Sequence, residues 1–110
     1  MAIKNIDLVR GDTLAFGVVC EGLSQDLDYA YMTCKKNFDD SQMVFQKSIG
    51  DGITKVSDQV YRVRVAPGDT EGVDEGEYYY DFVIGINDDR FTILTGVLNI
   101  LPDVTRNEAT

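Results

Sequence analysis

The segment from Glu77 to Ile86 shows the alternation of a β-strand that buries one of its faces. Aromatic or aliphatic side chains occupy its even positions, namely Tyr78, Tyr80, Phe82, Ile84 and Ile86. Successive side chains of a strand point to opposite faces of a sheet, so this period of two places all five on one side. The segment therefore predicts a strand packed against a hydrophobic core, and it indicates the class of fold before any chemistry is considered.

Shorter runs of the same kind fill most of the remaining chain, separated by Gly, Asp and Asn turn residues. The predicted strands cover residues 4–9, 13–20, 29–36, 43–49, 60–65, 77–86 and 90–101, and residues 53–56 are a candidate for a small additional strand. Pro67 suits the first turn of a helix, so we expect a single helical turn at 66–70. Seven alternating strands at hairpin spacing predict an all-β fold, an immunoglobulin-like β-sandwich of about seven antiparallel strands.

One local feature supports this architecture. Tyr78 stands where a tyrosine corner is found in such sandwiches, and its hydroxyl is expected to bond back to the backbone of the preceding loop. Tyr80 then occupies the place of the second disulfide cysteine of antibody domains, and the predicted strand at 29–36 has no tryptophan. Both antibody hallmarks are missing, so only the architecture carries over.

Size and charge limit the kinds of partner. The 110 residues correspond to one domain, with 1–102 expected to form the sandwich and 103–110 a flexible C-terminal tail. A net charge of −9 disfavours nucleic acid and anionic membranes as partners. The acidic surface serves solubility or, alternatively, docking of a basic partner.

The start of the chain has no apolar stretch typical of a secretion signal, so we expect the cytoplasm as its site of synthesis and residence.

The residue inventory offers little to a metal or a cofactor. Cys20 and Cys34 are the only cysteines and there is no histidine, so the usual four-ligand zinc site cannot be completed. We expect the two thiols to be reduced and packed as small hydrophobic groups, with a disulfide as the alternative. Acids that could bind calcium from one loop are Asp69, Glu71, Asp74 and Glu75. Their spacing does not match the usual calcium loop, so we predict no metal and no cofactor.

Catalysis is not indicated either, and we predict that the chain is not an enzyme. Nucleophilic catalysis needs a base beside the nucleophile, and histidine, the commonest base, is absent. The carboxylates fall in predicted turns, where Asp is favoured for local backbone reasons. Residues 10–12 spell Arg-Gly-Asp, an integrin-recognition tripeptide, but Gly and Asp also suit the turn predicted there.

A surface is the more informative feature. In an immunoglobulin-like sandwich the strands at 29–36, 77–86 and 90–101 share a sheet. The side chains predicted on its outer face form a candidate protein interface: Tyr29, Tyr31, Tyr79, Val83, Phe91, Ile93 and Val97. Contiguous exposed apolar area on a soluble protein usually marks an interface. The alternative is a one-residue phase shift at a β-bulge, which would return some of these side chains to the core.

The opposite sheet is expected to differ. The predicted strand at 60–65 presents Arg62 and Arg64 on its outer face, with Tyr61, Val63 and Val65 facing inward. This contrast suggests that one sheet faces water and the other faces a partner.

A series of short fragments resembles a known family. In order they are Arg10-Gly11-Asp12-Thr13, Phe45-Gln46-Lys47, Gly50-Asp51-Gly52-Ile53, Pro67-Gly68-Asp69-Thr70, Gly76-Glu77-Tyr78-Tyr79-Tyr80-Asp81, Thr95-Gly96 and Pro102-Asp103-Val104-Thr105-Arg106. Together they resemble small immunoglobulin-like modules of tailed bacteriophages and prophages, and the N-terminal domain of the upper baseplate protein in particular. The likeness covers nearly the whole chain, but the baseplate protein continues into further regions beyond this domain.

The resemblance implies a structural role and brings no catalytic residues. It leads us to expect a non-enzymatic subunit of a phage or prophage particle, in a baseplate, tail or fibre, assembled in the bacterial cytoplasm. Its partners would be copies of itself or other phage structural proteins, with neither nucleic acid nor membrane involved. The alternative is a bacterial carbohydrate-binding or adhesin-type module, in which Tyr29, Tyr31 and Tyr79 would provide the sugar platform.

Overall fold

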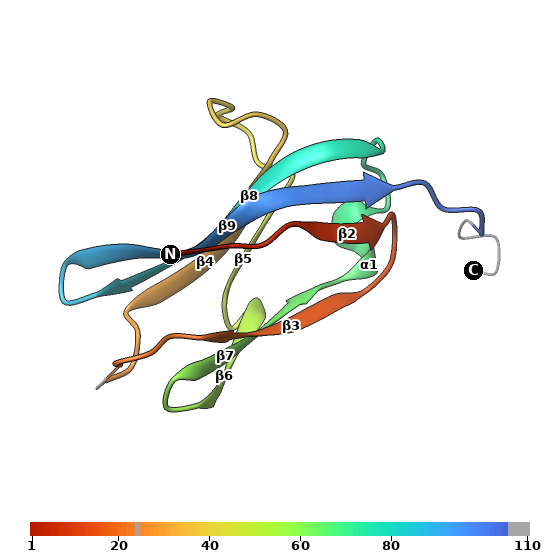
Figure 1. Ribbon diagram of the computed structural model, residues 1–110. Helices are drawn as coiled ribbons and strands as arrows, with labels where there is room; N and C mark the ends of the chain where they lie inside the picture. The colour runs from red at the N-terminus through yellow and green to blue at the C-terminus, as the bar shows by residue number, and fades with distance from the viewer. Residues whose placement is uncertain (24, 106–110) are drawn as a thin grey trace.

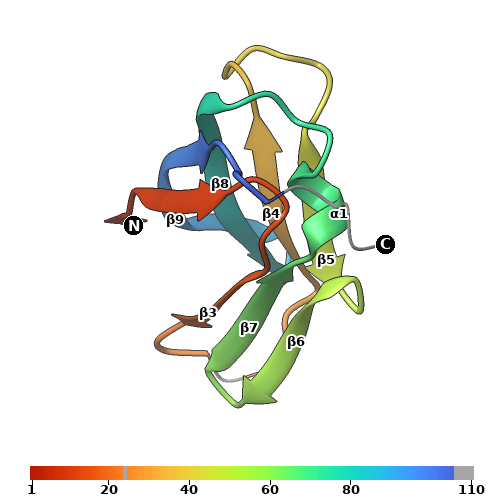
Figure 2. The ribbon, with the colours of Figure 1, turned by 90° about the vertical axis from the view of Figure 1, so that its right-hand side faces the viewer.

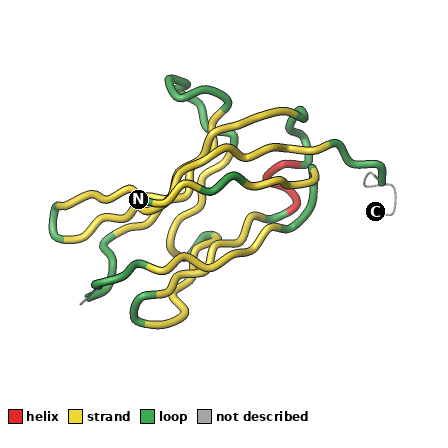
Figure 3. The backbone as a smooth tube through the Cα atoms, viewed as in Figure 1, coloured by secondary structure: helices red, strands yellow, loops and turns green. Residues whose placement is uncertain are grey.

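The computed structural model describes residues 1–23 and 25–105, and they form an almost entirely β structure (Figures 1 and 3). The strands are β1 (Ala2–Ile3), β2 (Ile6–Val9), β3 (Leu14–Val19), β4 (Tyr29–Lys35), β5 (Phe45–Ile49), β6 (Gly52–Ser57), β7 (Val60–Val65), β8 (Gly76–Ile86) and β9 (Asp89–Leu101). The predicted helical turn is present as α1 (Pro67–Thr70). In this part of the chain no helix is both long and apolar enough to cross a membrane.

The strands form two layers, which Figure 1 shows one above the other. One layer has the order β1-β9-β8-β4-β5, with β2 also paired to β9, and the other has the order β6-β7-β3. A short parallel pairing joins the layers, where Ser48 lies opposite Gly52 and Ile49 opposite Ile53. Figure 2 shows the smaller layer from the side, with β3, β7 and β6 next to one another.

A single hydrophobic core fills the space between the layers. Its largest fully buried side chains come from both sheets and include Tyr61, Phe82, Met32, Ile53 and Leu98. Burial follows the predicted alternation: on β7, Val63 is buried whereas Arg62 and Arg64 are exposed. The predicted immunoglobulin-like sandwich is therefore confirmed.

The strand neighbours differ in detail from a simple antiparallel arrangement. The predicted strand at 4–9 forms only at its end, as β2, and the chain adds β1, which was not predicted; both run parallel to β9. The predicted strand at 43–49 becomes β5, a neighbour of β4, while the candidate extra strand at 53–56 becomes β6, a full partner of β7. The chain thus changes layers between β5 and β6, at a turn made by Gly50 and Gly52 with positive φ.

The predicted tyrosine corner is also confirmed. The Tyr78 hydroxyl donates a hydrogen bond to the Asp74 carbonyl oxygen at 2.6 Å. Tyr80, in the place of an antibody cysteine, donates instead to the Lys4 carbonyl oxygen at 2.6 Å and so fastens the N-terminal segment. Cys20 and Cys34 are both free and buried, as predicted for packed thiols, and burial raises the pKa of the Cys34 thiol to about 12.

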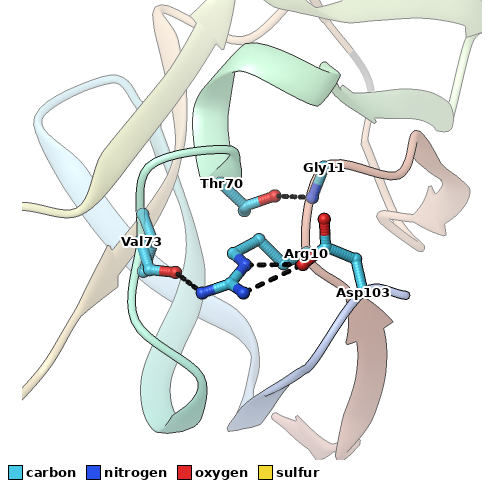
Figure 4. Close-up of polar contacts among 5 residues, drawn as sticks. All are labelled: Arg10, Gly11, Thr70, Val73 and Asp103. Atoms are coloured by element: carbon cyan, nitrogen blue, oxygen red, sulfur yellow. Dashed lines mark hydrogen bonds and ion pairs between the residues drawn. The ribbon is translucent and has the colours of Figure 1, made fainter. Parts of the chain in front are cut away.

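The Arg10-Gly11-Asp12 segment forms the expected turn and is held by contacts of its own (Figure 4). The Arg10 guanidinium donates to Asp103 at 2.9 Å and to the Val73 carbonyl oxygen at 3.2 Å. The Gly11 N–H donates to the hydroxyl of fully buried Thr70 at 2.9 Å. We call this set of five residues the Arg10 cluster. Asp103 begins the predicted tail, whose positions 106–110 lie outside the described residues.

Candidate functional site

The outer face of β4 and β8 carries the predicted interface. Register places Tyr31 opposite Val83, Thr33 opposite Asp81 and Lys35 opposite Tyr79. Directly opposed residues project to the same face of a sheet, so these six side chains share one side. The intervening residues of β4 are buried in the core, which leaves this set on the outside.

This outer face is concave. It carries an open hollow of about 490 Å³ that runs over β4 and β8 and is bordered by the loop at 36–44. The lining residues are Tyr29, Tyr31, Thr33, Lys35, Phe38, Met43, Gln46, Tyr79, Tyr80, Asp81, Val83, Arg90 and Thr95. The volume lies within the range of about 300–1,000 Å³ that is usual for ligand pockets.

Aromatic rings form two walls of the hollow. Tyr29 and Tyr31 have ring centroids 5.5 Å apart and are tilted by 32°. Phe38 stacks on Tyr79 at 4.2 Å with an interplanar angle of 27°. Aromatic pairs in such arrangements attract each other, and their exposed ring surfaces are apolar area on which a partner can pack.

Gly85 explains how Tyr29 reaches its position. A Cβ atom placed on Gly85 would lie 1.9 Å from the Tyr29 ring. The Tyr29 ring therefore lies directly over the backbone of β8, and any side chain at position 85 would clash with it. This is a close approach of the kind that glycine in a strand often marks.

Charged groups lie among the rings. Burial raises the pKa of the Asp81 carboxyl above its ordinary value, and the nearby cations Arg90 and Lys35 lower it by less. A half-buried carboxylate flanked by two cations can accept hydrogen bonds from a polar or cationic ligand group. The hollow thus combines aromatic packing surface with a few directional polar groups.

Four of the seven predicted interface residues line the hollow: Tyr29, Tyr31, Tyr79 and Val83. Val83 is only 5% exposed, yet it is absent from the core cluster, which places it beneath the outer side chains. Val97 lies opposite Tyr79 in the β8–β9 register and is half-buried, but it does not line the hollow.

The prediction was wrong about the face occupied by Ile93 and Phe91. Register shifts between Phe82 and Val83, whose partners on β9 are Leu94 and Thr92, so Ile93 between them has no partner. Such a bulge reverses the alternation, and Ile93 packs against the core. Phe91 then lies opposite Ile84, on the core side of the ribbon, and is 48% exposed near the end of the β8–β9 hairpin.

Sequence reasoning missed the polar and loop residues of the hollow. Thr33, Lys35 and Asp81 lie on the predicted outer phase of β4 and β8, so the alternation could have found them if polar positions had been included. Phe38 and Met43 come from a loop, where no periodicity predicts direction. A lone aromatic residue within a polar turn cluster was the only available signal.

The acidic loop considered for calcium has a different role. Lys47 on β5 forms an ion pair with Asp69 at 2.6 Å, and the Ala66 N–H donates to the same carboxylate at 2.7 Å. Asp69 therefore ties α1 to β5. Within residues 1–23 and 25–105 no group of three or more Cys, Asp or Glu side chains is arranged to hold a metal ion.

Comparisons with known proteins place the fold. No protein-family model matches the sequence, and no curated protein matches it closely enough to count as a relative. The immunoglobulin-like domain of mouse leukocyte-associated immunoglobulin-like receptor 1, crystallised as a strand-swapped dimer, is similar with a TM-score of 0.55 at 11% identity, and 88% of each chain is covered.

Two further solved structures agree. The extracellular domain of the voltage-gated sodium channel beta4 subunit, solved as parallel homodimers, has a TM-score of 0.52 at 15% identity, covering 94% of this chain and 95% of that one. A putative glycoside hydrolase from Bacteroides vulgatus has a TM-score of 0.51 at 16% identity, covering 93% of this chain but 17% of that one. At such identities the likeness concerns the fold alone, and the fold of this chain is an immunoglobulin-like β-sandwich.

Proposed function

We propose that this protein is a non-enzymatic structural subunit of a phage or prophage particle that acts by binding other proteins through the hollow on β4 and β8. The observation that carries the proposal is the aromatic lining of this outer face in a chain of net charge −9. Aromatic side chains concentrated on one face of an otherwise charged surface are typical of protein interfaces. The thin acid–base inventory supports a binding role rather than catalysis.

The Arg10 cluster brings together three of the fragments on which the resemblance to phage modules rests. Three fragments that resemble the phage modules, at 10–13, 67–70 and 102–106, are far apart in sequence, yet their residues Arg10, Thr70 and Asp103 meet in this cluster. The three fragments therefore lie together in the fold.

A partner would bind by inserting an apolar side chain between the two aromatic walls. A polar or cationic group beside it would meet Asp81, whose pKa is raised by burial and whose ionised form would gain from such a neighbour. An interface of standard size buries about 800 Å² on each partner, more than the hollow alone offers, so the surrounding rim would take part. Partners would be further copies of the chain or other virion proteins, met in the bacterial cytoplasm during assembly.

The mass of the protein in solution tests the self-association arm of this proposal. We expect light scattering across the micromolar range to give a mass above the 12.3 kDa of one chain. Tyr31→Glu, which places a charge in the hollow, is expected to return the mass to that of one chain. The matched control is Thr54→Glu, an exposed position on the smaller sheet, which should leave the mass unchanged.

Binding to virion proteins tests the other arm. Tail and baseplate proteins encoded beside the gene would be purified and titrated against the wild type and Tyr31→Glu. We expect at least one of these proteins to bind the wild type and not to bind Tyr31→Glu. A chain that stays monomeric and binds none of these proteins would refute the proposal.

The hollow also favours a second candidate, a carbohydrate-binding or adhesin-type module. Sugars stack on aromatic rings and bond to carboxylate, guanidinium and amide groups, and here Asp81, Arg90 and Gln46 lie beside the tyrosines. A glycan array distinguishes the two functions. Hits that disappear with Tyr29→Ala, from a protein that remains monomeric, would favour sugar binding over assembly.

A further inference from the structure

The edge strand β3 has an open side. It is the last strand of the β6-β7-β3 layer, and within residues 1–23 and 25–105 its one partner is β7, through an unbroken antiparallel register from Leu14 to Val19. Both β1 and β2 pair with β9 in the other layer, so neither of them covers β3. Figure 2 shows β3 at the border of its layer.

The open side presents a row of backbone hydrogen-bonding groups. The Cys20 N–H donates to the Gln59 carbonyl oxygen at 2.7 Å, across to the β7 side. Backbone groups of a strand alternate in direction, so Ala15, Gly17 and Val19 direct their N–H and C=O groups to the open edge. All three residues are exposed.

Nothing in the sequence of β3 protects this edge. Natural proteins usually guard such strands with charged side chains, proline or a bulge. The run from Thr13 to Cys20 has neither charge nor proline, and its pairing with β7 shows no register shift. An unprotected edge of this kind accepts a further strand, a recurring way in which proteins bind extended segments.

Charge indicates what that strand should carry. Arg62 lies opposite Gly17 and Arg64 opposite Ala15, all on the exposed face of this layer. No ion pair of either arginine occurs among the residues that the structure describes. Because Gly17 and Ala15 are small, the two guanidinium groups are not screened from the edge by side chains of β3. A strand added there would place every second side chain within reach of them.

We propose that β3 binds an extended segment of a partner protein as an added strand, and that this segment carries Asp or Glu at alternate positions facing Arg62 and Arg64. A second copy of β3 suits the site less well, because it is uncharged and would bring the same two arginines of the other copy onto one face. This site is separate from the hollow, which lies on the other layer, so it holds whether or not the hollow binds as proposed above.

A pair of synthetic peptides tests the proposal. One alternates Glu with Val, and the other has Lys in place of every Glu. Their binding to the intact protein is measured by fluorescence anisotropy at low and high salt. We expect the Glu peptide to bind, the Lys peptide not to bind, and the affinity to fall as salt screens the arginines. Equal binding of the two peptides, or binding of neither, would overturn the proposal.

Two sets of variants separate backbone pairing from charge. Gly17→Pro removes one open-edge N–H and spares the bonds to β7, and proline is tolerated where a strand N–H faces solvent. It should weaken binding at least about tenfold, whereas Gly17→Ala, whose added Cβ has no atom closer than 4.0 Å, should not. Arg62→Glu with Arg64→Glu should weaken it similarly, and Arg90→Glu on the other layer should not.

Folding of each variant is checked by circular dichroism. If Gly17→Pro does not fold, the arginine pair still decides the outcome, because both side chains are exposed. Retained affinity in the arginine pair would refute the acidic partner. A dimer that Gly17→Ala keeps and Gly17→Pro dissolves would show that the edge binds a second copy instead. Tyr31→Glu should leave peptide binding unchanged, which distinguishes failure at this edge from failure at the hollow.

Discussion

Tyr78 and Tyr79 are neighbours in the chain and have opposite roles. Tyr78 is buried, donates its hydroxyl to the Asp74 carbonyl and lies beneath the Lys36 ammonium, which is 4.6 Å from its ring centroid. Tyr79 is half-buried, stacks on Phe38 and lines the hollow. Successive side chains of a strand point to opposite faces, so two adjacent tyrosines serve the core and the candidate interface respectively.

Replacing Tyr78 by Phe should lower the free energy of unfolding by about 1 kcal/mol, because it removes the part-buried hydrogen bond to the Asp74 carbonyl oxygen. The ring and its contact with Lys36 would remain. Urea denaturation measures the change. Tyr79→Phe is the matched control and should change stability little, since no hydrogen bond to its hydroxyl occurs among the described residues. Equal effects of the two variants would contradict this account of the tyrosine corner.

Asp81 predicts a pH dependence. Burial raises the pKa of its carboxyl, so the folded protein holds this proton more tightly than the unfolded chain does. Its ionisation therefore costs folding free energy as the pH rises above the ordinary aspartate pKa of about 3.9. Asp81→Asn should match the wild type at about pH 3 and be more stable than it at about pH 7.

The measurement is the urea unfolding free energy of both proteins at the two pH values. Asp88→Asn, at an exposed turn with positive φ that Asn tolerates, is the control and should change stability little at either pH. If Asp81→Asn were instead less stable at neutral pH, attraction by Arg90 and Lys35 would outweigh desolvation.

At the scale of elements, the N-terminal strands depend on one glycine of β9. A Cβ atom on Gly96 would lie 2.0 Å from the Lys4 carbonyl oxygen, which is backbone and cannot swing aside. The Lys4 carbonyl oxygen also accepts a hydrogen bond from the Tyr80 hydroxyl, and the Lys4 N–H donates to the Thr95 carbonyl oxygen. Gly96 therefore allows β1 and β2 to lie against β9.

Gly96→Ala should displace this N-terminal segment and destabilise the protein by about 1–3 kcal/mol, as overpacking commonly does. Hydrogen exchange should show faster exchange of the Lys4 amide, and thermal melting should show the loss of stability. Gly17→Ala is the matched strand control, because its added Cβ meets nothing closer than 4.0 Å. A fully stable Gly96→Ala protein would contradict the close approach.

The β8–β9 hairpin shows where alternation stops being a guide. Pairing is regular from Gly76 to Phe82, and there the predicted faces hold. The extra residue Ile93 then reverses the side-chain alternation of the β9 residues that precede it, 89–92. Bulges of this kind arise from cross-strand register, which depends on both strands together, so the sequence of β9 alone does not reveal its position.

At the scale of the whole molecule, the two layers offer two different surfaces. The larger layer carries the aromatic hollow on its outer face. The smaller layer ends in an uncharged edge beside Arg62 and Arg64. Because the two surfaces lie on different layers, a partner bound at one of them would leave the other accessible.

Local alternation was sufficient to predict most strands and their buried faces as far as the bulge at Ile93, because burial of one face leaves a period of two in the sequence. The positions of Tyr78 and Pro67 predicted the tyrosine corner and the helical turn, which are likewise local features. Only the folded structure revealed three other features. These are the stacking of Phe38 on Tyr79, the placement of β5 and β6 in different layers, and the pairing of β1 and β2 with β9 instead of β3. These features depend on contacts between distant segments, whose free energies compete with one another and leave no periodic trace in any one of them.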